Sequence, residues 1–265
     1  MKKNISYLLL SFVVWNCHSE EAITTHEPKL DYYVESYDIP DLGFQPNLKI
    51  VYEYNSSGKL SKYIVSSYHP DLDSFHELRH VDLIYSDNAV VSKILGYLPG
   101  KLNPYLEYTY EYLPDGRVSK IAETNTSIGI NSEANFVYND TDQSTKVFYT
   151  FSNGGSFEYE FQLNGGNIVT DKTTRGSQLC SDGQYAYDDR INPFKNLGYT
   201  DYLLTNVSAN NKVSENINHI NCSFPSFIPE SYTYEYNDLG YPSLITTHYK
   251  SGSTVVRSQK ESFYK

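Results

Sequence analysis

Residues 52–63 read YEYNSSGKLSKY and residues 110–121 read YEYLPDGRVSKI, so the two segments align without a gap. Before the turn, tyrosine alternates with a polar residue, and this period of two places the tyrosines on one face of a β-strand. The next four residues fit a type I turn, with Pro114 at its second position and Gly58 or Gly116 at its fourth. Glycine there allows the left-handed backbone of a bulged hairpin. Each copy therefore predicts one antiparallel β-hairpin.

Further copies of this unit run along the chain. Residues 84–94, IYSDNAVVSKI, keep the spacing but lose the glycine, and residues 234–242, YEYNDLGYP, keep the turn. Weaker copies start at Phe136 and Tyr159. A lone hairpin is unstable in water, so the copies must pair side by side. We predict an all-β fold: an antiparallel meander of repeated hairpins that forms one large curved or partly closed sheet, an incomplete barrel.

The N-terminus has the pattern of an export signal. Lys2 and Lys3 precede an apolar stretch, residues 5–15, that is too short for a comfortable membrane span. Cys17 follows at once, as in bacterial lipoprotein signals, where the cysteine becomes the acylated first residue. We predict a signal peptide over residues 1–16 and lipidation of Cys17; the alternative is an ordinary signal peptide with a chance cysteine. This interpretation places the protein in the cell envelope, anchored to the outer membrane on its surface or periplasmic face.

The remainder divides into a tether and one domain. Residues 17–30 are polar and predict a tether, and residues 31–265 predict a single hairpin-repeat domain. Residues 179–230 break the repeat with asparagines and prolines, which predicts an insertion with a short helical turn near Tyr202 to Leu204.

Cysteine usage agrees with an exported protein. The chain has three cysteines, so lipidation of Cys17 leaves Cys180 and Cys222 as a pair. The envelope is oxidising, and we predict a disulfide between them. Two buried free thiols are the alternative.

Charge and composition exclude some partners and suggest others. The net charge of −11 argues against nucleic acid, whose phosphates need a basic surface. Tyrosine is extreme at 27 residues and could supply a core or a binding surface. The stripes that carry this alternative are Tyr108, Tyr110, Tyr112, Tyr232, Tyr234 and Tyr236. Packing in the core is the favoured interpretation, and stacking on a glycan or an envelope protein is the functional one.

A zinc-protease pattern appears at residues 76–80, HELRH. That chemistry needs a helix to bring both histidines to one metal. Residues 75–85 instead alternate as a strand, which would separate His76 and His80 by about 13 Å. We predict a strand here and no metal site.

Two other groups of oxygen-bearing side chains offer candidate sites beside simpler structural roles. Glu53, Glu111 and Glu235 share one repeat position opposite the tyrosines, and a pair of them could serve glycoside hydrolysis. Solvent-exposed strand residues are the favoured interpretation. Residues 188, 189 and 192 (Asp, Asp and Asn) could bind calcium through oxygen ligands, but a loop anchored by Phe194 is favoured.

Two resemblances follow from these motifs. Gly58-Lys59-Leu60 and Gly116-Arg117-Val118 resemble the YD-type repeat, although the aspartate after the leading tyrosine is missing. Residues 187–194, YDDRINPF, match a Tyr-Asp-x-x-x-Asn-Pro-Phe segment. With the hairpins, this segment resembles uncharacterised exported lipoproteins of Gram-negative bacteria. The resemblance implies a curved, partly closed all-β sheet and supplies no established activity.

The sequence therefore favours a non-enzymatic binding or scaffold module of the cell envelope. We expect contact with the membrane through the lipid anchor, a glycan or an envelope protein as partner, and no cofactor. A carbohydrate-active or other hydrolytic enzyme is one alternative. A structural subunit of an envelope complex is the other.

Overall fold

The computed structural model describes residues 28–220, 228–251 and 254–265. These residues form sixteen strands and two single 3-10 turns, η1 (Pro70–Leu72) and η2 (Lys195–Leu197). The strands are β1 (Leu30–Ile39), β2 (Gly43–Tyr54), β3 (Leu60–His69), β4 (Ser74–Tyr85), β5 (Val91–Tyr97), β6 (Leu106–Tyr112), β7 (Val118–Asn125), β8 (Ile130–Asn139), β9 (Ser144–Phe151), β10 (Ser156–Asn164), β11 (Asn167–Arg175), β12 (Gln178–Ile191), β13 (Asn210–His219), β14 (Ile228–Tyr236), β15 (Pro242–Ser251) and β16 (Thr254–Tyr264).

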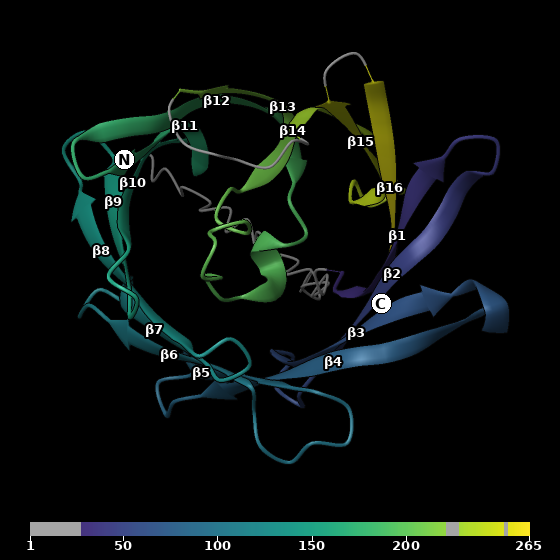
Figure 1. The fold of residues 1–265 in the computed structure, drawn as a ribbon, viewed down its shortest axis with the longest axis horizontal. Helices are drawn as coiled ribbons and strands as arrows, with labels where there is room; N and C mark the ends of the chain where they lie inside the picture. Colours follow the sequence, from purple (N-terminus) through teal and green to yellow (C-terminus); the bar gives the residue numbers. More distant parts are fainter. Residues whose placement is uncertain (1–27, 221–227, 252–253) are drawn as a thin grey trace, which may run out of the picture.

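The strands form one closed barrel (Figure 1). Each strand pairs antiparallel with its neighbours in sequence, which confirms the predicted meander. The predicted incomplete barrel is wrong, because β1 pairs with β16 from Leu30–Tyr264 to Tyr37–Ser258. Two backbone hydrogen bonds extend this seam: Lys29 N to Lys265 O at 3.0 Å, and Lys265 N to Lys29 O at 2.9 Å. Closure pairs the backbone groups that an open sheet would leave exposed at its two edges.

The repeat turns have the predicted geometry. Gly58 N donates to Asn55 O at 2.8 Å, and Gly58 has a φ of +76°. The copy without glycine makes the same turn: Ala89 N donates to Ser86 O at 2.9 Å, and Ala89 takes a φ of +61°. The turn is therefore kept even where its preferred residue is absent.

The two faces of the sheet differ in chemistry. Tyrosines and aliphatic residues point into the barrel, where they form the core. The outer face carries charges that pair across neighbouring strands, for example Lys93–Glu107 at 2.7 Å, Lys120–Glu133 at 2.7 Å and Lys146–Glu158 at 2.8 Å. The alternation of Tyr and Glu in the repeat thus places the tyrosines on the inner face of the barrel wall and the charged residues on its outer face.

One set of inward tyrosines, which we call the clasp tyrosines, ties neighbouring strands together near one rim. Each lies near the end of an even-numbered strand and donates its hydroxyl to a carbonyl near the start of the preceding strand. The bonds are Tyr54 to Leu30 (2.8 Å), Tyr85 to Leu60 (2.7 Å), Tyr112 to Val91 (2.6 Å), Tyr138 to Val118 (2.7 Å), Tyr187 to Ile168 (2.7 Å) and Tyr264 to Pro242 (2.8 Å). In the repeat copies at residues 52–63, 84–94 and 110–121, the last tyrosine before the turn therefore links two neighbouring strands by a hydrogen bond.

The predicted insertion contributes two strands and one internal loop. Within residues 179–230, β12 and β13 belong to the barrel wall. Residues 192–209, which we call the plug, leave the wall and lie inside the ring (Figure 1, green). The helical turn of the plug is η2, a few residues before the predicted position. A barrel of this strand number has room for an internal segment.

Candidate functional site: a tyrosine-lined cavity beside the plug

The plug has a structure of its own. Asn192 starts it: its side-chain oxygen accepts from Phe194 N at 3.0 Å, and its side-chain nitrogen donates to Ser208 O at 3.0 Å. In the middle of the plug, Asp201 accepts from Thr205 N at 3.0 Å. These local bonds fold residues 192–209 into a compact loop, as expected of Asn and Asp in turns.

Inward tyrosines hold the plug in place. Tyr110 donates its hydroxyl to Thr200 O at 2.9 Å, and Tyr149 donates to Tyr202 O at 3.0 Å. Tyr202 in turn donates to Ser132 Oγ at 2.8 Å. Because these bonds come from β6, β8 and β9, the plug is fixed to one side of the barrel.

Phe194 anchors the start of the plug on the opposite wall. Its ring meets Tyr33 of β1 edge-on, with centroids 5.9 Å apart. The predicted loop is wrong for residues 187–191, which belong to strand β12, and the loop that Phe194 anchors begins only at Asn192. Asp188 accepts from Asn211 N at 3.1 Å and from the Tyr236 hydroxyl, so it also holds the plug region together.

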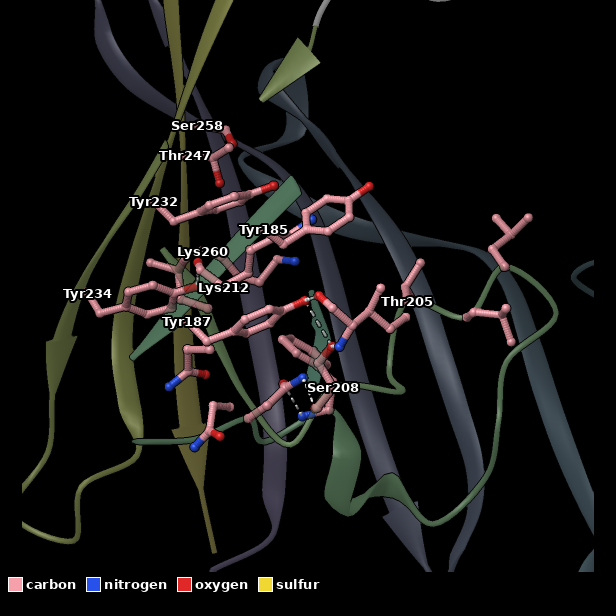
Figure 2. Close-up of a pocket in the computed structure, with 18 of the residues that line it drawn as sticks. Tyr185, Tyr187, Thr205, Ser208, Lys212, Tyr232, Tyr234, Thr247, Ser258 and Lys260 are labelled. Carbon is pink, nitrogen blue, oxygen red and sulfur yellow. Dashed lines mark hydrogen bonds between the residues drawn. The ribbon is translucent and has the colours of Figure 1, made fainter. Parts of the chain in front are cut away.

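A cavity of about 380 Å³ lies between the plug and strands β10 to β16. Its wall includes six tyrosines, and Figure 2 shows four of them, Tyr185, Tyr187, Tyr232 and Tyr234, grouped around two lysines. The polar part of the lining consists of hydroxyl and amide groups: Asn192, Thr205, Ser208, Asn210, Asn211, Thr247 and Ser258. This size and mixture of aromatic and polar groups are typical of small-molecule sites.

The two lysines of the cavity have different surroundings. The ammonium group of Lys212 forms an ion pair with Glu215, and its Nζ lies 5.0 Å from the ring centroid of Tyr185. Lys260 Nζ lies 4.6 Å from the ring centroid of Tyr33 and 5.1 Å from that of Phe194. No ion pair or hydrogen bond reaches Lys260 Nζ from the part of the chain that the structure describes.

Burial also affects the protonation of these groups. Desolvation lowers the pKa of Lys260, and the negative charge of Glu35 partly opposes this shift. Burial raises the pKa of Tyr232 and Tyr234, so both hydroxyls are neutral at neutral pH, and that of Tyr234 donates to Lys212 O at 2.6 Å. The cavity therefore offers neutral hydroxyls together with one unpaired ammonium group.

The predicted tyrosine stripes all face the barrel interior, but they have different roles. Tyr232 and Tyr234 line the cavity described above. Tyr108 and Tyr110 line a second space of about 470 Å³ on the other side of the plug. Tyr112 is a clasp tyrosine. The tyrosines of the stripes therefore pack inside the barrel, as the sequence favoured, and Tyr232 and Tyr234 also border the cavity.

Several cavity residues were missed at the sequence level. Lys260, Lys212 and Glu35 belong to strands that carry no copy of the repeat. The available signal was alternation: Ser258, Lys260 and Ser262 share the inward face of β16. Alternation alone does not say which face of β16 points inward, because this depends on how the barrel closes.

The histidine motif lies in a strand, as predicted. Residues 76–80 belong to β4, where His76 pairs with Ser67 and His80 with Ile64 of β3. His80 Nδ1 lies 2.8 Å from Glu77 Oε1. Each imidazole is therefore engaged locally along the strand.

The three glutamates that share one repeat position lie far apart around the barrel. Glu53, Glu111 and Glu235 are exposed on the outer face, on strands β2, β6 and β14, which are not neighbours. This confirms the interpretation as solvent-exposed strand residues. Asp189 points to solvent with its side chain 93 % exposed, away from the bonded carboxylate of Asp188.

The predicted lipidation site and one cysteine of the predicted disulfide fall outside the described residues. Cys17 and Cys222 lie there, whereas Cys180 is buried at the start of β12. Ile220 N donates to Cys180 O at 2.9 Å, so the chain passes beside Cys180 two residues before Cys222. The disulfide stays a prediction that this register supports. As for helices, the described residues contain none with the length and hydrophobicity to cross a membrane.

Comparison with known proteins identifies a fold. No protein-family model and no curated protein matches the chain. Among solved structures, a porin-like protein from Bacteroides uniformis has 11% sequence identity and a TM-score of 0.56, covering 89% of this chain and 98% of that one. A porin-like protein from Bacteroides vulgatus has 13% identity and a TM-score of 0.44, over 90% of this chain and 99% of that one. The chain is thus similar in fold to a porin-like β-barrel.

Proposed function

We propose that the protein is an envelope lipoprotein whose barrel stays in water and binds a small molecule in its interior. The observation that carries this proposal is the tyrosine-lined cavity, enclosed by the barrel wall and closed on one side by the plug. A binding module needs such a preformed, mixed aromatic and polar pocket. The acylated Cys17 would connect the barrel to the membrane.

The outer face supports a barrel that stays outside the bilayer. Membrane barrels have an apolar band of about 25 Å facing lipid, and each charge there costs roughly 2–4 kcal/mol at the bilayer midplane. Here the ion pairs Lys93–Glu107, Lys120–Glu133 and Lys146–Glu158 lie on the outer face of strands β5 to β10. The repeat tyrosines, such as Tyr52, Tyr110 and Tyr234, point inward instead. Polarity is therefore reversed relative to a lipid-facing barrel.

Filling the cavity tests the binding proposal. Thr247 lines the cavity and its neighbour Thr246 faces outward on the same strand, β15. We expect glycan-array ligands of the wild type to lose binding in Thr247→Trp and to keep it in Thr246→Trp. Equal binding by both variants, or an array without any ligand, would contradict an interior site.

The anchor is tested separately. We expect Cys17→Ser to move the protein from the membrane fraction to the soluble fraction of cells. If the variant still fractionates with membranes, the lipid anchor is refuted, but the interior site is not.

A further inference from the structure

Lys260 lies at a position where an ammonium group is costly. It faces inward on β16 between Ser258 and Ser262, opposite Glu35 on β1. Aromatic rings of Tyr33 and Phe194 flank it at 4.6 and 5.1 Å. Cation–π contacts recover part of the lost hydration, but an ammonium group also has three hydrogen bonds to donate. Within the described residues, none of these donors has a protein acceptor.

The other lysine of the cavity, Lys212, has an ion-pair partner, in contrast to Lys260. Lys212 has the carboxylate of Glu215 as its ion-pair partner, and the Glu215 side chain is only 4% exposed. Lys260 has a carboxylate opposite it, Glu35, but the two groups are not within ion-pair distance. The donors of Lys260 are therefore open toward the cavity, while those of Lys212 are used.

Glu35 places a second condition on the ligand. It lines the cavity as an acceptor and would repel an anion that lacked a donor for it. A ligand that meets both groups needs a carboxylate for Lys260 and hydroxyls for Glu35. The surrounding tyrosine rings and the hydroxyl and amide groups suit a sugar ring, since aromatic faces stack on its apolar side.

We propose that the cavity binds an acidic sugar, a uronic acid, with its carboxylate on Lys260 and its hydroxyls toward Glu35 and the polar lining. This inference rests on the proposed interior binding site and names its ligand class. A charge-assisted bond in this partly desolvated place is strong, because it also pairs the half-buried ammonium group of Lys260.

Titration calorimetry with four sugars tests the class. The probes are glucuronate, galacturonate, glucose and galactose, and the protein is the mature chain with Cys17→Ser. We expect at least one uronate to bind about tenfold tighter than its neutral counterpart. The methyl ester of that uronate keeps the shape and removes the charge, so it should bind like the neutral sugar. Failure of both uronates to bind, or equal binding of acid and ester, would overturn the proposal.

Variants then assign the charge to one residue. Lys260→Met keeps an unbranched side chain, one atom shorter, and removes the ammonium group, so it should lower uronate affinity about tenfold and abolish the preference for the acid over the neutral sugar. Lys172→Met removes an equal charge from the exposed outer face of β11 and should change neither. A uronate preference that survives in Lys260→Met would refute the role of Lys260. If neutral sugars bind and Thr247→Trp blocks them, the interior site stands without the acidic ligand; if no sugar binds, both proposals fall.

Discussion

Removal of one clasp hydroxyl should destabilise the barrel measurably. Tyr112 donates to Val91 O at 2.6 Å, and the Val91 side chain is buried at 1% exposure. Tyr112→Phe removes this bond and leaves the carbonyl without that donor. A hydrogen bond contributes about 1 kcal/mol, and a stranded partner adds to the loss, so we expect a decrease of about 1–2 kcal/mol in the free energy of unfolding. For a domain of this size, the decrease corresponds to roughly 2–6 °C in melting temperature.

Urea denaturation followed by circular dichroism measures this change, and the chain offers a matched control. Tyr97 lies on the outer face of β5, stacked on His80, and its hydroxyl has no hydrogen-bond partner among the described residues. Tyr97→Phe should therefore change stability by less than about 0.5 kcal/mol. Adding Tyr138→Phe to Tyr112→Phe should give nearly additive losses, because the two hydroxyls bond to different carbonyls. If Tyr112→Phe is as stable as Tyr97→Phe, the clasp tyrosines do not stabilise the barrel through their hydroxyl groups.

Three other outcomes are expected. Ala89 holds a left-handed φ of +61°, so Ala89→Gly should stabilise the protein by about 0.5–1 kcal/mol after the entropy of the unfolded chain is subtracted; a loss of stability would contradict the strain. Burial raises the pKa of Tyr54 and Tyr138 to about 12, so the stability that they contribute is complete below pH 10 and is lost as pH rises through 12. Denaturation midpoints that stay constant over this interval would refute that linkage. Thiol labelling of the denatured, non-reduced protein should find Cys180 and Cys222 blocked, and two labelled thiols would exclude the disulfide.

The hairpins could be predicted because they depend only on residues that are close together in the sequence. The Tyr-x-Tyr alternation, the turn and its glycine specify a hairpin within about a dozen residues, and the strand at residues 74–85 followed from the same register. The exposed glutamates opposite the tyrosines could be placed for the same reason.

Closure and the cavity could not be predicted in this way, because both depend on contacts between distant parts of the chain. Strand β1 carries no copy of the repeat, and its pairing with β16 joins Leu30 to Tyr264. The plug was recognisable as a break in the pattern, but its position inside the ring depends on tyrosines of β6 and β9. Lys260 becomes conspicuous only when the inner side of β16 is known.

The seam between β1 and β16 also determines the order in which the protein can fold. Hairpins such as β2–β3 and β6–β7 need only neighbouring residues and can form while the chain emerges. The seam joins residues separated by nearly the whole sequence, so its loop entropy must be overcome at once, and contacts of this kind are slow to form. Until the last eleven residues of β16 arrive, the sheet has two open edges that could recruit other chains. The barrel therefore completes its fold only after the whole chain is available, and a chain shortened at its C-terminus would be a substrate for aggregation or proteolysis.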